Sequence, residues 1–251
     1  PAEMSPYDFS KETITKTGFV TEGFTTYYGD WFLKQSGVFN QDEYFSELNL
    51  LFKRHFENYG RHEVSLVQAS QNLWVDGYKN LYPSKKVSIY VKGALCALIL
   101  DMNIMKHTKN QYSLIDVIKK LYTRHTYEKG GYAIQDVYKI ISEFGDSSMP
   151  ELLEVLYEST ADLLPILEQA LLYVGCELVP QAHTDLYTSK LGIKVDNNRI
   201  TEIAPGCHTE NYLSVGDQLL TCNEKEFDFS NEVLIIFRIL SKFSTSTSTV
   251  T

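Results

Sequence analysis

The sequence lacks three features that would point directly to a function. Its four cysteines (Cys96, Cys176, Cys207 and Cys222) form no Cys-x-x-Cys pair, which excludes a zinc ribbon and a thioredoxin-like site. Acidic residues outnumber basic ones by 32 to 23, and the net charge of −9 without a basic cluster argues against a nucleic-acid partner or an anionic membrane. No apolar run approaches a membrane span. We expect a soluble protein, cytoplasmic or periplasmic, and the sequence does not decide between these compartments.

The chain has the material for a sizeable core. Its 251 residues are 43% hydrophobic and 22% charged, which suits one large domain or two ordinary ones. From about residue 17 to 173 the apolar residues recur at helical spacing. The helices are expected at 18–32, 41–60, 87–106, 113–125, 133–145, 149–160 and 163–175. Gly60 and Gly175 are expected to end two of them, Ser113 to cap one, and 87–106 to be a central buried helix.

After Cys176 the pattern changes. Short β-branched runs at 191–195, 199–205 and 217–223 are separated by turn dipeptides, which predicts strands. A helix is predicted over 230–242, and the closing "STSTSTVT" is either a low-complexity tail or a last polar strand. The sequence therefore predicts an all-α domain over residues 1–179 and a β-rich domain over 180–251.

Glu22 is the most informative single residue. It lies in the aromatic run "GFVTEGFTTYYGDWF" (18–32), and on a helical wheel its neighbours are Gly18, Thr25, Thr26 and Gly29, opposite the bulky set. The wheel alone favours a solvated glutamate on the polar face of an amphipathic helix, because a glutamate is rarely buried unless it is paired or bound to a metal. The small neighbours would also leave room for another group to approach the carboxylate.

Three segments together indicate a family. "TEGFTTYY" (21–28), preceded by "PYDFSKETITK", resembles the segment that follows the HExxH helix in PDZ-containing glycyl aminopeptidases, which are gluzincin metallopeptidases with a thermolysin-like catalytic domain. "VSIYVKGALCALILDM" (87–102) is similar to their Tyr-x-Lys-Gly helix, and residues 191–227 resemble a bacterial-type PDZ core. Each match alone is weak, but their order and separation together are specific.

This resemblance assigns two catalytic-domain residues. In such enzymes two histidines of HExxH and a glutamate on the following helix hold Zn²⁺, and Glu22 matches that glutamate. Tyr90 matches the tyrosine that stabilises the negative charge developing on the scissile carbonyl. The alternative for Tyr90 is one more core aromatic. A second Tyr-x-Lys-Gly, at 127–130, precedes a Gly-Gly turn instead of opening a buried helix and is rejected.

HExxH itself is missing. His62-Glu63 lacks a histidine four residues after His62, and His55 and His62 are expected on the surface. The resemblance therefore implies that the metal-binding histidines and the general base lie before Pro1. We expect this chain to be a C-terminal fragment that binds no zinc and is inactive on its own, and we expect its substrate-amine site to lie in the part before Pro1.

The PDZ resemblance implies a peptide site. Leu191, Gly192 and Ile193 match a loop whose backbone amides would bind a peptide C-terminus, and Val233 or Leu234 could shape a side-chain pocket. The alternative is a PDZ-like domain that serves only as an intramolecular brace, or one whose groove is closed.

Two functions follow. The first is part of a zinc aminopeptidase that removes Gly or Ala from the N-termini of peptide substrates. The second is a non-catalytic module that binds peptides through its PDZ-like domain. An HExxH segment upstream of Pro1 in the parent sequence would distinguish them.

Overall fold

The computed structural model describes residues 1–77, 86–179, 181, 183, 185, 187–222, 225–226, 237–240 and 247–250. The chain divides into two compact units, Pro1–Leu178 and Val179–Thr251. Within the described residues no helix is both long enough and apolar enough to cross a membrane.

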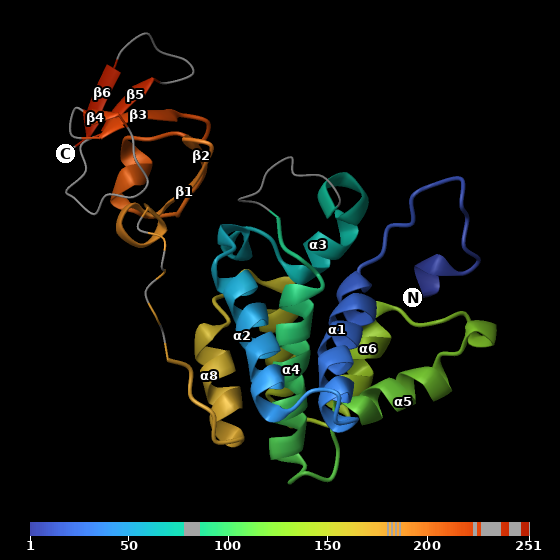
Figure 1. Ribbon diagram of the computed structural model, residues 1–251. Coiled ribbons are helices and arrows are strands. Elements are labelled where there is room, and N and C mark those ends of the chain that lie inside the picture. The colour runs from blue at the N-terminus through green and yellow to red at the C-terminus, as the bar shows by residue number, and fades with distance from the viewer. Residues whose placement is uncertain are drawn as a thin grey trace. The chain divides into compact units, whose positions relative to one another are not determined.

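The first unit is helical throughout its described part (Figure 1). Its α-helices are α1 (Gly18–Gln35), α2 (Gln41–Phe56), α3 (Leu66–Gln71), α4 (Val91–His107), α5 (Leu114–Arg124), α6 (Ile134–Ser142), α7 (Met149–Leu153) and α8 (Leu164–Tyr173). Single 3₁₀ turns lie at Ala2–Met4, Tyr59–His62 and Tyr127–Lys129, and π-type turns lie at Leu73–Gly77 and Glu154–Glu158.

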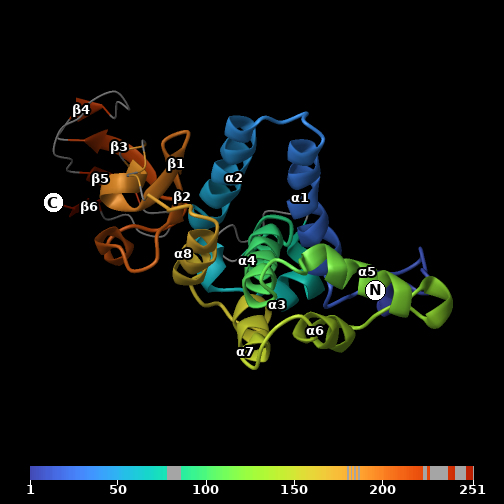
Figure 2. The ribbon, with the colours of Figure 1, turned by 90° about the horizontal axis from the view of Figure 1, so that it is seen from below.

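Helix α4 lies in the middle of this unit, where α1, α2, α5 and α8 contact it (Figures 1 and 2). Its residues from Lys92 to Met102 are all buried, as expected of a central apolar helix. The helix begins at Val91, later than predicted, and the Val91 amide donates to the Ser88 hydroxyl at 3.2 Å.

Two predicted helix ends have different outcomes. Gly175 follows α8 with φ of +74°, the left-handed conformation that a C-terminal glycine adopts, so this prediction is confirmed. The end at Gly60 is wrong, since α2 stops at Phe56. Gly60 is buried in the next 3₁₀ turn, where a Cβ atom would lie 2.5 Å from the Lys86 carbonyl oxygen. This glycine is needed for a close approach of two backbone segments.

In its described residues the second unit carries a six-stranded antiparallel sheet. Its strands are β1 (Ile193–Asp196), β2 (Arg199–Ile203), β3 (Gln218–Cys222), β4 (Lys225–Glu226), β5 (Phe237–Leu240) and β6 (Thr247–Val250), in the order β1-β2-β3-β5-β6 with β4 beside β3. The small core of this unit is formed by Tyr187, Ile193, Ile200, Leu213 and Leu219.

The strands predicted after residue 190 are present as β1, β2 and β3. Asn197 and Asn198, with φ of 48° and 60°, form the two-residue turn between β1 and β2, which is the hairpin turn that such dipeptides favour. The helix predicted over 230–242 is wrong for residues 237–240, which form β5 and pair with β3. Residues 230–236 and 241–242, with Val233 and Leu234, lie outside the described residues.

The polar C-terminus takes the strand alternative over Thr247–Val250. This segment forms β6 and pairs with β5 in an antiparallel register, Phe237 opposite Val250 and Leu240 opposite Thr247. The apolar run 237–240 is short and rich in branched and aromatic residues, so it suits a strand as well as a helix, and pairing with β3 and β6 decides its conformation.

Candidate functional site

Glu22 lies one turn into α1, at the edge of the face that the helix buries. The aromatic side chains of Phe19, Phe24, Tyr27 and Tyr28 are buried, while Glu22 is half-buried. Its four small neighbours have different surroundings. Thr25 and Gly29 are exposed, Thr26 is half-buried, and Gly18 is buried, so that a Cβ atom there would meet the Ile89 side chain at 3.2 Å and Ser70 Oγ at 3.3 Å. The open face beside Glu22 is therefore formed by Thr25 and Gly29, without Gly18.

Helices α1 and α4 touch through two glycines. A Cβ atom on Gly23 would lie 2.6 Å from Gly93 Cα, and one on Gly93 would lie 2.9 Å from Gly23 Cα. Before this glycine contact in both segments Gly18 approaches Ile89, and after it Tyr27 contacts Asp101. Because the contacts advance in the same direction along both segments, the two helices run parallel. Glu22 precedes Gly23 by one residue and Tyr90 precedes Gly93 by three. Both therefore lie within one helical turn of this contact.

Tyr90 sits at the N-terminal boundary of α4, with helical dihedral angles (φ −70°, ψ −57°) and a carbonyl that accepts the Ala94 amide at 2.9 Å. Its side chain is 41% exposed, whereas its neighbour Ile89 is 2% exposed. Tyr90 is therefore not a core aromatic. The rejected motif at 127–130 forms a single 3₁₀ turn that ends at Gly130 with φ of +85°, and Tyr127 is exposed.

Lys92, between these motif residues, is 1% exposed. Its Nζ has no hydrogen-bond partner among the described residues, and burial lowers the pKa of its ammonium group. The third residue of the Tyr-x-Lys-Gly motif thus points into the helical core, and the fourth forms the contact with α1. No local pattern in the sequence predicts the burial of this lysine.

The two histidines near the end of α2 differ. His62 is exposed, as predicted, but His55 is 3% exposed, so its surface placement is wrong. It packs edge-on against Phe56, and burial, together with the nearby Lys92 and Arg61, lowers the pKa of His55 to about 3. His55 is therefore a neutral core residue at neutral pH.

The described residues hold no group of three His, Cys, Asp or Glu side chains arranged to bind a metal. A protein zinc site needs three or four such ligands. Within this part of the chain Glu22 could supply only one ligand of a larger set, and these residues do not fit a zinc ion by themselves.

The predicted peptide-binding loop lies at the start of β1. Gly192 has φ of +67°, and its amide donates to the Thr188 carbonyl at 3.2 Å. The Gly192 carbonyl accepts the Ala204 amide, and the Leu191 carbonyl accepts the Thr209 hydroxyl. Ile193 is buried and pairs with Ile203. One of the three amides is thus already used inside the chain, and the peptide-binding role of Leu191, Gly192 and Ile193 stays a prediction.

Sequence reasoning named Glu22 and Tyr90 but missed the role of the glycines beside them. A glycine inside an apolar helix costs about 1 kcal/mol relative to alanine, so one that persists indicates a packing reason. Gly23 and Gly93 each carry that signal. The sequence could therefore have suggested a close helix contact, although it could not say which helices meet.

The comparisons with known proteins add two findings. A model of the M61 glycyl aminopeptidase family matches residues 1–96, a segment that contains both Glu22 and Tyr90. Four chains of solved structures match, among them the crystal structure of an aminopeptidase N family protein from Idiomarina loihiensis, at 19% identity and a TM-score of 0.79. The alignment covers 99% of this chain but 46% of that chain. A search of curated proteins gave no match.

The solved structure establishes similarity of fold, and the present chain spans less than half of its length. The family match includes the two segments, 21–28 and the start of 87–102, that carried the resemblance in the catalytic part. Residues 1–96 match the M61 glycyl aminopeptidase family, the family that the motifs in this part of the chain predicted.

Proposed function

We propose that this chain is part of a zinc-dependent aminopeptidase in which Glu22 is one metal ligand and Tyr90 donates a hydrogen bond to the reacting carbonyl. The observation that carries the proposal is the Gly23–Gly93 contact, which brings the two residues within one turn of the same point on two parallel helices. The family match over residues 1–96, which includes both, supports it.

Each residue has a separate task. The carboxylate of Glu22 would bind zinc together with ligands from outside the described residues, and zinc when bound activates a water molecule and polarises the scissile carbonyl. The Tyr90 hydroxyl would donate to the carbonyl oxygen as negative charge develops there. Thr25 and Gly29, on the open side of α1, would leave the space through which the other ligands approach Glu22.

The helical unit is proposed to be the all-α part of a thermolysin-like catalytic domain, and the sheet unit a PDZ-like domain. We infer that peptides with a small N-terminal residue are the substrates: Gly by analogy with the name of the matched family, and Ala as the resemblance of the motifs implies. We also infer that the isolated 251-residue chain binds no zinc and is inactive, because one carboxylate does not replace a set of three ligands.

The test uses the parent protein and matched variants. We expect Glu22→Gln to abolish stoichiometric zinc and activity, and Glu47→Gln, at another half-buried helical glutamate, to preserve both. We expect Tyr90→Phe to keep zinc and to lower kcat by a factor on the order of 10²–10³, the usual effect of removing one oxyanion donor. Tyr127→Phe, in the exposed copy of the motif, should leave kcat unchanged.

Elemental analysis measures the zinc content of each variant, and kinetics on Gly- and Ala-anilides measure its kcat. Zinc retained by Glu22→Gln would remove Glu22 from the ligand set. Full turnover by Tyr90→Phe would remove the role of Tyr90.

A further inference from the structure

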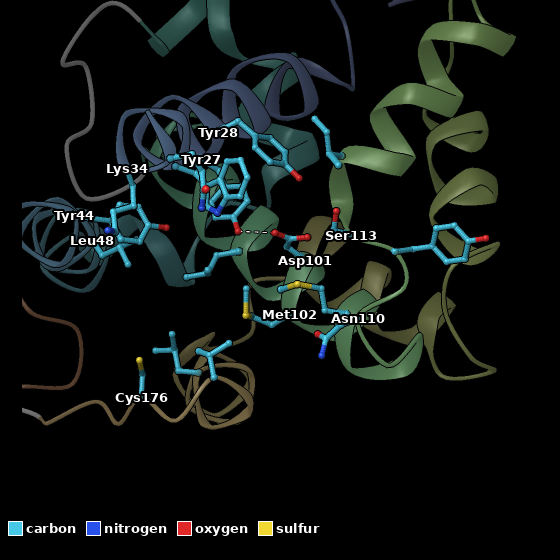
Figure 3. Close-up of a pocket in the computed structure, with 18 of the residues that line it drawn as sticks. Tyr27, Tyr28, Lys34, Tyr44, Leu48, Asp101, Met102, Asn110, Ser113 and Cys176 are labelled. Carbon is cyan, nitrogen blue, oxygen red and sulfur yellow. Dashed lines mark hydrogen bonds between the residues drawn. The ribbon is translucent and has the colours of Figure 1, made fainter. Parts of the chain in front are cut away.

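A cavity of about 650 Å³ lies two turns along α4 from the Gly23–Gly93 contact (Figure 3). The second half of α1, α2, the second half of α4, the start of α5 and the end of α8 all contribute to its lining. Its volume suits a small organic molecule. Neither Glu22 nor Tyr90 lines it, so its contents are a question separate from the proposed peptidase chemistry.

Aromatic rings form one side of the cavity. Tyr27, Tyr28 and Trp31 from α1 and Tyr44 from α2 all line it. The Tyr27 and Tyr28 rings meet edge-on with centroids 5.0 Å apart, and the Tyr28 and Trp31 rings do so at 6.0 Å. Such a cluster presents several electron-rich π surfaces to one space, and organic cations bind to surfaces of this kind.

Asp101 supplies a buried carboxyl group at this cluster; burial raises its pKa, and the hydrogen bonds from the Leu114 amide and the Tyr27 hydroxyl lower it. Asp101 is 5% exposed, and its carboxylate accepts the Tyr27 hydroxyl at 2.6 Å (Figure 3). The carboxylate also accepts the Leu114 amide at 2.7 Å. Within the described part of the chain no lysine, arginine or histidine lies within 4.0 Å of it to form an ion pair. A buried carboxylate without a cationic partner is costly, even when two donors contact it.

Asp101 is the buried one among the charged residues of the lining. Lys34 and Asp116 are half-buried, and Asp116 is already paired with Lys119 at 3.1 Å. The negative charge of Asp101 reaches three phenols: after burial it helps to raise the pKa of Tyr27 and of Tyr28, and after burial and Asp30 it contributes to the rise in the pKa of Tyr44 to about 12.

The Tyr28 hydroxyl is another polar group in the lining. Tyr28 is 6% exposed, and its hydroxyl makes no hydrogen bond among the described residues. The Ile115 amide lies near the Tyr28 hydroxyl and slightly offsets the rise in the pKa of Tyr28, but the two groups do not have hydrogen-bond geometry. A buried hydroxyl without a hydrogen-bond partner favours a ligand that carries a hydrogen-bonding group.

We propose that this cavity binds an organic ammonium ion with an apolar body. The ammonium would lie near the Asp101 carboxylate and the Tyr28 hydroxyl, against the aromatic rings, and the apolar body would contact side chains such as Leu48 and Met102. A carboxylate ligand would be repelled by Asp101, and a neutral ligand would gain only the apolar contacts. The site therefore selects by charge as well as by size.

Three probes of nearly the same shape test this on the 251-residue chain by titration calorimetry at pH 7.5. They are 4-phenylbutylamine, 4-phenylbutanol and 4-phenylbutyrate. We expect saturable binding of the amine at least about tenfold tighter than that of the alcohol, the effect of one charge-assisted contact, with the acid weakest. The proposal is overturned if the amine does not saturate or if the alcohol binds as tightly.

Two variants locate the binding. Asp101→Asn keeps an acceptor for the Leu114 amide and should abolish the preference for amine over alcohol. Leu48→Trp should fill the cavity without touching Asp101 and should weaken all three probes, while Leu50→Trp, at an exposed site of α2 outside the lining, should not. If Asp101→Asn does not fold, the Leu48 and Leu50 variants still decide. Equal amine binding by these two would place the ligand elsewhere and refute the proposal.

Discussion

The glycine contact between α1 and α4 can be tested with one methyl group. In Gly23→Ala the new Cβ atom would lie 2.6 Å from both Cα and the carbonyl carbon of Gly93, well short of the 3.4 Å at which ordinary contact begins. The atoms it meets are backbone atoms of a buried helix, so no side-chain rotation can relieve the overlap. The two helices must move apart by about 0.8 Å, or one must shift along the other.

The expected free energy change combines two opposing effects. Overpacking of a well-packed core typically costs 1–3 kcal/mol, and alanine gains about 1 kcal/mol over glycine in a helix interior. Because the overlap is with backbone, we place the overpacking cost at the upper end of that range. The net expectation for Gly23→Ala is a loss of about 1–2 kcal/mol in the free energy of unfolding.

Gly29→Ala is the matched control on the same helix. Nothing lies within 4 Å of the position that its Cβ atom would take, so only the helix propensity should act, with a gain of up to about 1 kcal/mol. Urea unfolding of the 251-residue chain followed by circular dichroism measures both variants. If Gly23→Ala were as stable as Gly29→Ala, the close backbone contact would not exist as described.

Two further predictions concern buried titratable groups. Burial lowers the pKa of His55 to about 3, so below pH 6.5 this imidazole takes up a proton in the unfolded chain but not in the folded chain. The free energy of unfolding should therefore fall by up to about 1.4 kcal/mol per pH unit between pH 6 and pH 4. His55→Phe should flatten this slope in urea titrations. A slope unchanged in His55→Phe would contradict the burial of this imidazole. Lys92→Met should keep or raise stability, since it removes a buried amine without a partner and retains the shape of the side chain; a loss above about 1 kcal/mol would show that the amine has a stabilising partner.

The sequence predicted the parts of the fold that local rules determine. The Asn197–Asn198 turn, the glycine after α8 and the apolar helix α4 all follow from short-range conformational preferences and hydrophobic periodicity. The errors at Gly60 and at 237–240 have the opposite origin. Gly60 is required by the distant Lys86 backbone, and the strand at 237–240 is fixed by pairing with β3, so neither is visible in a local pattern.

The candidate site could be predicted only in part for the same reason. Glu22 and Tyr90 were found because they belong to motifs that resemble a family. The burial of His55 and Lys92 was not found, since it depends on how the end of α2 packs against α4. The cavity around Asp101 was not found either, because five helices separated along the chain build it.

The hydrogen bonds of Asp101 have a consequence for the order of folding. The bond from the Leu114 amide spans 13 residues, whereas the bond from the Tyr27 hydroxyl spans 74. Closing a short loop costs less chain entropy than closing a long one, so the α4–α5 pair can form before α1 joins it. Asp101 would then cap α5 early in folding and bind Tyr27 later, so that one carboxylate takes part in both a local and a long-range step. We expect pulse-labelled amide exchange to protect α4 and α5 before the second half of α1.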